Sequence, residues 1–240
     1  IICDLDDKTD DSVEFYQTHK DKAKYLFITD MDFFTHLELL QENKISNIFP
    51  KGLLIEDYLT SAKLISNLCK GNVIGIHNYT NFPIFMETIP VHYTAHIRKL
   101  FFKIDFLFPS FSKDKTIMLK LAFSEILSNT FFHSHNMQKG QSIYLEEPII
   151  VSFAEDREKI LFSVMDKKGT LDRDSVFSWL LKRYQKADSL PMDHGRGLFL
   201  IKNIVDNLII NIKKDELTEF IAIFYKQNYM GEKSLIIQQL

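Results

Sequence analysis

Residues 125–133 read EILSNTFFH, and this stretch decides how the C-terminal two-thirds of the chain is interpreted. Glu125, Asn129 and His133 are spaced i, i+4, i+8, so in a helix their side chains lie along one stripe. Apolar residues surround the stripe, which indicates a largely buried helix whose Glu and Asn need partners or a ligand. The same spacing also fits the solvent-facing edge of an amphipathic helix.

A second segment, residues 193–201, reads DHGRGLFLI and places two glycines at the start of a predicted apolar helix. Gly195 and Gly197 permit close approach of the backbone, and the free N–H groups of a helix N-terminus bind phosphate well. Glycines also begin helices for structural reasons alone, so this pattern is weak evidence by itself.

A third segment, residues 162–166, is a predicted strand that ends in Asp166 and is followed by Gly169. An aspartate at the end of a strand can accept a hydrogen bond from the amino group of adenine. It can equally be a turn residue, so this segment gains weight only from the other two.

Taken in their order along the chain, the three segments resemble the Bergerat-type (GHKL) ATPases, the superfamily of gyrase, histidine kinases and mismatch-repair ATPases. Residues 125–133 resemble the N-box, Asp166 resembles the aspartate of the first glycine box, and residues 195–200 resemble the second glycine box. The GRGLFL form and the layout of residues 84–226 look most like the anti-sigma-factor serine kinases.

The resemblance implies ATP and Mg²⁺ as cofactors, with Asn129 as the Mg²⁺ ligand and Glu125 as the general base. It implies that His133 supports the phosphates or the turn that carries Asn129, and that Asp166 recognises adenine. The other implied nucleotide-binding residues are Gly169, Gly195, Arg196, Gly197 and Leu198. The family pattern D-x-G-x-G reads DKKGT here, so Lys168 stands at the first glycine and either narrows the pocket or points outward.

The first 72 residues alternate short apolar runs with helical patterns, which is typical of a parallel α/β sheet. Asp4, Thr29 and Lys51 each follow one of three predicted strands. The trio resembles receiver domains of response regulators, whose flavodoxin-like fold carries its site at the carboxyl ends of the strands. The resemblance implies Asp4 as phosphoacceptor, Thr29 as switch hydroxyl and Lys51 as phosphate-binding lysine. A receiver begins with two further strand–helix units, so we expect an incomplete receiver-like segment.

The bulk composition is that of a globular protein: 240 residues, 45% apolar and 25% charged. A net charge of -3 argues against nucleic acid as a partner. No apolar run approaches the roughly 20 residues of a membrane helix. The lack of such a run leads us to expect no membrane binding. Two cysteines make no disulfide framework, so we expect a cytoplasmic protein.

The sequence therefore predicts an α/β plus α+β fold: a receiver-like regulatory domain at residues 1–72 and a two-layer α/β sandwich that binds ATP at residues 82–228. The resemblance implies a bacterial signalling protein whose kinase domain phosphorylates serine on an anti-sigma antagonist or binds a sigma factor, and it allows a homodimer. The alternative is a non-catalytic adaptor with a degenerate nucleotide pocket. A histidine kinase is disfavoured because no phosphoacceptor-histidine hairpin is evident.

Overall fold

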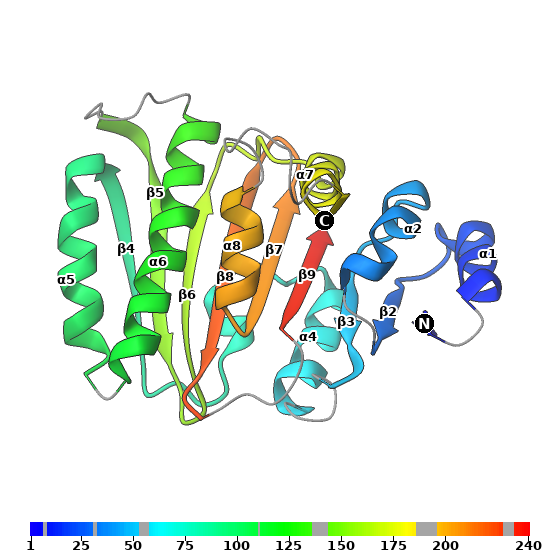
Figure 1. Cartoon of the computed structure of the whole chain (residues 1–240), viewed down its shortest axis with the longest axis horizontal. Helices are drawn as coiled ribbons and strands as arrows, with labels where there is room; N and C mark the ends of the chain where they lie inside the picture. Colours follow the sequence, from blue (N-terminus) through cyan, green and yellow to red (C-terminus); the bar gives the residue numbers. More distant parts are fainter. Residues whose placement is uncertain are drawn as a thin grey trace.

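The computed structural model describes residues 1–6, 9–30, 33–52, 58–109, 111–135, 144–185, 196–227 and 233–240. Its strands form two sheets, one of three strands in the order β1-β2-β3 and one of six in the order β4-β5-β6-β8-β7-β9. The sheets lie next to each other, with β9 of the larger sheet beside β3 of the smaller one (Figure 1).

The smaller sheet is parallel throughout, as the alternation of apolar runs and helical patterns predicted. Phe27 packs in the core beneath the first two helices, whereas its neighbour Leu26 packs with Leu64 and Leu68 of the last helix. The sheet is therefore covered on both faces. Its elements are β1 (Ile2–Asp4), α1 (Thr9–His19), β2 (Leu26–Thr29), η1 (Phe33–His36), α2 (Leu37–Glu42), β3 (Ile48–Pro50) and α4 (Tyr58–Lys70).

Gly71 ends α4 in the left-handed conformation (φ 68°), and its N–H donates to the carbonyl of Leu68 at 3.1 Å. Gly71 therefore has the C-cap role that a left-handed glycine commonly takes at a helix end. A linker with a short 3-10 helix, η2 (Ile76–Tyr79), then leads to the larger sheet.

The larger sheet is antiparallel except for its last pair, β7 and β9, which run parallel. Strand β9 lies outside the predicted range 82–228, yet it adds the sixth strand next to β7. The strands are β4 (Phe85–Tyr93), β5 (Tyr144–Glu155), β6 (Lys159–Asp166), β7 (Asn207–Lys213), β8 (Leu217–Tyr225) and β9 (Ser234–Gln239).

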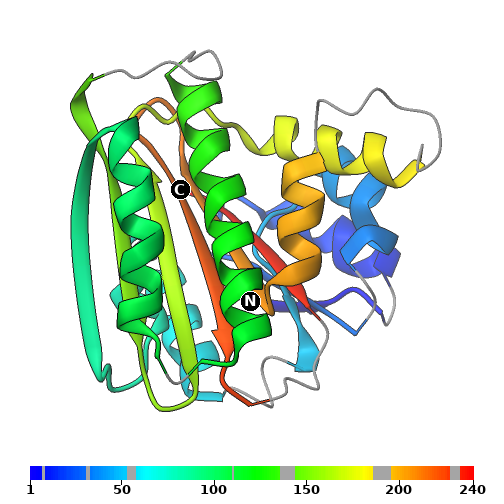
Figure 2. The ribbon, with the colours of Figure 1, turned by 60° about the vertical axis from the view of Figure 1, so that its left-hand side comes forward.

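Helices cover one face of this sheet, as Figures 1 and 2 show for α5, α6 and α8. The helical elements are η3 (Thr94–His96), α5 (Ile97–Leu107), α6 (Lys113–Asn129), the π-helical turn η4 (Thr130–Ser134), α7 (Arg173–Gln185) and α8 (Arg196–Ile204). Helix α7 packs against α8, which covers the larger sheet, and against α2, which covers the smaller sheet.

The opposite face of the larger sheet is also partly covered, because Ile76 and Tyr79 of the linker pack on its strands. A buried polar network attaches the linker there. Glu219 Oε2 accepts hydrogen bonds from the N–H of Gly75 at 2.9 Å and from Asn211 Nδ2 at 3.0 Å. The sandwich thus has a partial third layer that the sequence did not predict.

Besides the shared hydrophobic core, hydrogen bonds join the smaller sheet's unit to the larger one. The N–H of Asn47, just before β3, donates to the carbonyl of Ile237 in β9 at 2.9 Å. Gln41 Nε2 of α2 donates to Ser178 Oγ of α7 at 3.0 Å. Of the helices in the described part of the chain, none has the length and apolarity to cross a membrane.

Candidate functional site

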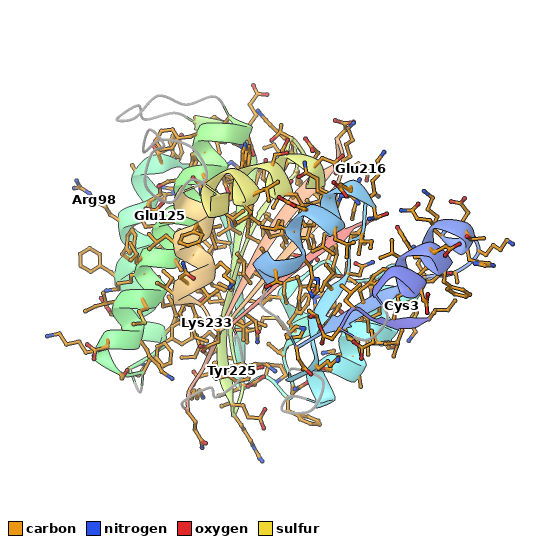
Figure 3. All side chains as sticks on the ribbon, turned by 45° about the vertical axis from the view of Figure 1, so that its right-hand side comes forward. Cys3, Arg98, Glu125, Glu216, Tyr225 and Lys233 are labelled. Atoms are coloured by element: carbon orange, nitrogen blue, oxygen red, sulfur yellow. The ribbon has the colours of Figure 1, made fainter. Side chains whose placement is uncertain are left out.

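Helix α6 carries the first motif and is capped at its N-terminus. Its N-cap, Ser112, accepts a hydrogen bond from the N–H of Lys115, which satisfies one of the free donors of the first turn. Phe123 and Ile126 are buried against the sheet, and this orientation leaves Glu125 and Asn129 half-buried at the side of the helix. Figure 3 shows Glu125 on α6 beside α8.

Gly197, in the first turn of α8, brings the second motif against the first. A β-carbon at this position would lie 2.9 Å from Asn129 Nδ2 and 3.1 Å from Glu125 Oε2. With any larger residue at this position, the Asn129 side chain would have to shift. This contact places Gly197 next to Glu125 and Asn129, although the two segments are distant in sequence.

A pocket of about 280 Å³ opens beside this contact. It lies between α6, α7 and α8 on one side and the adjacent strands β6 and β8 on the other. Its lining residues are Asn129, Thr130, Ser134, Asp166, Thr170, Leu171, Ser175, Val176, Trp179, Gly197, Leu198, Thr218 and Phe220.

Two buried oxygens mark the strand end of the pocket. Asp166 and Thr218 lie directly opposite each other on β6 and β8. Asp166 Oδ2 and Thr218 Oγ1 have no hydrogen-bond partner among the described residues, although both side chains are almost fully buried. Buried polar atoms are normally paired, so an acceptor and a hydroxyl left open in a pocket indicate a polar ligand.

His135 also lies at this end of the pocket. Its Nε2 is 3.4 Å from Asp166 Oδ1, and the two side chains are only 6% and 5% exposed. Burial, together with the nearby charge of Lys168, lowers the pKa of His135 below its ordinary value. The imidazole is therefore neutral at pH 7 and can donate one hydrogen bond.

Lys168 and Gly169 follow Asp166 without entering the pocket. The N–H of Lys168 donates to Asp166 Oδ1 at 3.2 Å, and its side chain is exposed and is not among the lining residues. Gly169 has φ 58°, and a β-carbon there would meet backbone atoms of the β7–β8 turn at 2.4 to 2.8 Å. Of the two placements that the sequence left open for Lys168, the structure shows the outward one.

Several predicted site residues fall outside the described part of the chain. Gly195 lies in the segment 186–195, and the side chains of His133 and Arg196 are likewise not described. Conversely, Thr218, Trp179 and His135 line or border the pocket without having been predicted. The sequence signal for Thr218 is its position in β8, but only the pairing register shows that it faces Asp166.

The second group of predicted residues meets at the carboxyl ends of β1, β2 and β3. Lys51 Nζ lies 2.8 Å from Asp4 Oδ2, 2.9 Å from Asp6 Oδ2 and 3.6 Å from Asp30 Oδ2. Thr29 Oγ1 donates to Asp6 Oδ1 at 2.5 Å. The structure thus brings Asp4, Thr29 and Lys51 together, with two further aspartates among them.

The charges in this cluster stabilise one another. Burial alone would raise the pKa of Asp6, but hydrogen bonds from Thr29 and Lys51 outweigh it and lower that pKa to about 2. Hydrogen bonds to Asp4 and Asp6 raise the pKa of the Lys51 ammonium group. The lysine is therefore positively charged, and its ammonium group lies among three carboxylates.

The fold and pocket define a class of structure: an α/β sandwich with a pocket beside an E-x-x-x-N helix. Residues 107–222 match the family model of the histidine kinase-like ATPase domain, a GHKL-type domain. That match contains α6, β6, α7 and α8 and ends within β8. No curated protein was found to match the chain.

Proposed function

We propose that the pocket binds ATP together with Mg²⁺. The observation that supports this most directly is the pair of open buried oxygens, Asp166 Oδ2 and Thr218 Oγ1, at one end of a pocket whose other end is Asn129 and Gly197. A carboxylate acceptor beside a hydroxyl matches the edge of adenine, which presents an amino donor next to a ring-nitrogen acceptor.

The other end of the pocket fits phosphate and Mg²⁺. Gly197 leaves room above Asn129, and the first N–H groups of α8 provide donors for phosphate oxygens. Asn129 supplies the amide oxygen of a Mg²⁺ ligand, and Mg²⁺ is usually held by few protein oxygens plus phosphates and water. When bound, the metal ion would neutralise charge that develops on the transferred phosphoryl group.

The finer part of the proposal is a protein serine kinase of the anti-sigma-factor type. Glu125 lies next to Asn129 and Gly197, where a carboxylate can accept the proton of an attacking hydroxyl. The GRGLFL sequence at the start of α8 supports the same subtype. A non-catalytic adaptor remains the alternative, but the exposed side chain of Lys168 removes one reason for it, because the pocket is not filled by that lysine.

The test uses Trp179, which lines the pocket and is the single tryptophan of the chain. We expect ATP with Mg²⁺ to change its fluorescence saturably and expect Asn129→Ala to weaken this binding at least tenfold, about 1.4 kcal/mol. Calorimetric titration provides the independent measurement. No binding at millimolar ATP would refute a nucleotide function, whereas binding without transfer of the γ-phosphoryl group to any protein would favour the adaptor.

A second proposal concerns residues 1–72, which we infer to be a receiver-like input. The supporting observation is the strand order β1-β2-β3 with helices on both faces, which matches the last three strands of the flavodoxin-like order 2-1-3-4-5. Lys51 lies where it can pair with a phosphoryl group on Asp4. In this proposal Asp4 attacks the phosphorus of a small acyl phosphate, the carboxylate Oδ–P bond forms, and the acyl carboxylate leaves.

Acetyl phosphate is the donor for this second test. Intact mass spectrometry should show one phosphoryl group on the wild-type protein and none on Asp4→Asn. The Asp30→Asn variant is the matched control, since Asp30 is the more distant of the carboxylates around Lys51. Equal labelling of wild type and Asp4→Asn would refute the assignment of Asp4.

A further inference from the structure

Three buried polar atoms at the strand end of the pocket have no hydrogen-bond partner among the described residues: His135 Nε2, Asp166 Oδ2 and Thr218 Oγ1. The proposed function uses the last two. We infer that His135 is a positioning residue, which holds the Asp166 carboxylate so that one oxygen is directed to the base and thereby selects an amino group over a carbonyl at that position. This inference rests on the proposed nucleotide function.

The local backbone explains how His135 reaches this place. Helix α6 ends at Asn129 and continues as the π-helical turn Thr130–Ser134, with the N–H of His135 donating to the carbonyl of Phe131 at 3.3 Å. A π turn takes up about one residue more than an α turn, so it changes the direction of the residues that follow. It brings Ser134 to the pocket wall and His135 to Asp166.

The two oxygens of Asp166 have different surroundings. Oδ1 accepts a hydrogen bond from the N–H of Lys168 at 3.2 Å and lies 3.4 Å from His135 Nε2. Oδ2 has neither contact. With the neutral imidazole protonated on Nε2, its N–H faces Oδ1 at 3.4 Å, on the same oxygen that accepts from Lys168, so a small approach fixes the rotation of the carboxylate and leaves Oδ2 for the ligand.

This arrangement makes base selection sensitive to the charge of His135. The charged groups around the imidazole are Asp166 beside Nε2, Lys168 on the loop after β6, and Glu147 on β5. Below its pKa the imidazole becomes a cation that pairs with Asp166 and withdraws charge from the acceptor oxygen. Discrimination between an amino and a carbonyl group should therefore weaken as the pH falls.

The experiment compares ATP with ITP, which has a carbonyl where adenine has its amino group. Each nucleotide is added to the protein in the presence of Mg²⁺, and binding is followed by Trp179 fluorescence at several pH values between 5.5 and 8. Their phosphates and Mg²⁺ titrate alike, so the ratio of the two dissociation constants reports only the base. The variants are His135→Gln, which keeps a donor near the Nε2 position without titrating in this range, and His135→Leu, which keeps volume without a donor.

We expect the wild-type preference for ATP to fall as the pH drops through the lowered pKa of His135. His135→Gln should retain the preference at every pH. In His135→Leu the preference for ATP over ITP at pH 8 should be about tenfold smaller than in wild type, which corresponds to one hydrogen bond to a charged group. Thermal unfolding of each variant shows whether it is folded, and the Gln variant serves as the test if the Leu variant is not.

Different outcomes separate the two proposals. If the wild-type protein binds neither nucleotide, the proposed function fails and His135 has no base to select for. If ATP binds and His135→Leu keeps the wild-type ratio, the positioning role is refuted while the nucleotide function stands. The role is equally refuted if the wild-type ratio falls at low pH and His135→Gln shows the same fall.

Discussion

Gly197→Ala is the substitution for which the structure gives the clearest expectation. The added methyl carbon would lie 2.9 Å from Asn129 Nδ2, against an ordinary contact of 3.4 Å or more. The Asn129 amide must therefore move by about 0.5 Å or rotate away. Metal–ligand distances hold to within about 0.2 Å, so an amide displaced this far no longer fits as a Mg²⁺ ligand.

Gly197→Ala should lower the affinity for ATP, whereas it should leave the free energy of unfolding nearly unchanged or slightly higher. Disturbing the placement of a metal ligand costs about 10–100-fold in metal affinity, so the affinity for ATP with Mg²⁺ should fall by about 1.4–2.7 kcal/mol. Folding should suffer little, because the clash is with the ends of two side chains at half-buried positions. Alanine also favours a helix over glycine by about 0.5–1 kcal/mol.

Two measurements on one sample test this expectation: urea unfolding without nucleotide and Trp179 fluorescence with ATP and Mg²⁺. Gly52→Ala is the matched control, because a methyl group there meets nothing within 4 Å and lies away from the pocket. If Gly197→Ala bound ATP as tightly as wild type, the close approach of α8 to Asn129 would have no role in nucleotide binding.

Three further predictions concern single side chains. Thr218→Val should raise the free energy of unfolding by about 1 kcal/mol in a urea titration, because it removes a buried hydroxyl without a described partner, and yet weaken ATP binding. Trp179→Phe should abolish the fluorescence response while calorimetry shows less than a tenfold loss of affinity, a modest cost for a partly exposed aromatic wall. Burial raises the pKa of Glu219 above its ordinary 4.5, so its contribution to stability is complete below pH 4.5 and is lost as the pH rises through the higher folded-state pKa. Glu219→Gln should remove that part of the pH dependence of urea unfolding and stabilise the protein at pH 7.

Most elements of the fold could be predicted from local sequence patterns. The first three strands, the helix around Glu125 and the strand ending in Asp166 all follow from periodicity and turn residues. Strand β9 could not be predicted this way, because SLIIQQ is a short apolar run and its pairing depends on the edge of β7 far away in sequence. The layer under the sheet was missed for the same reason: Tyr79 and Glu219 meet only in the tertiary structure.

The site residues also fall into those that local spacing predicts and those that only the tertiary structure brings together. Glu125, Asn129 and Gly197 could be predicted because their spacing is local to one helix or one turn, and the contact between them is observed. Thr218 depends on strand register, and Trp179 depends on how α7 packs. His135 depends on a π-helical turn, whereas the regular spacing of α-helices had pointed to His133.

The position of β9 has a consequence for the order in which the chain folds. Asn47 can bond to Ile237 only after the polypeptide between them has formed the larger sheet and β9 has paired with β7. Contacts between residues so distant in sequence form late and slow the search for the native state. We therefore expect native hydrogen exchange to show the smaller sheet opening more readily than the strands at the centre of the larger sheet.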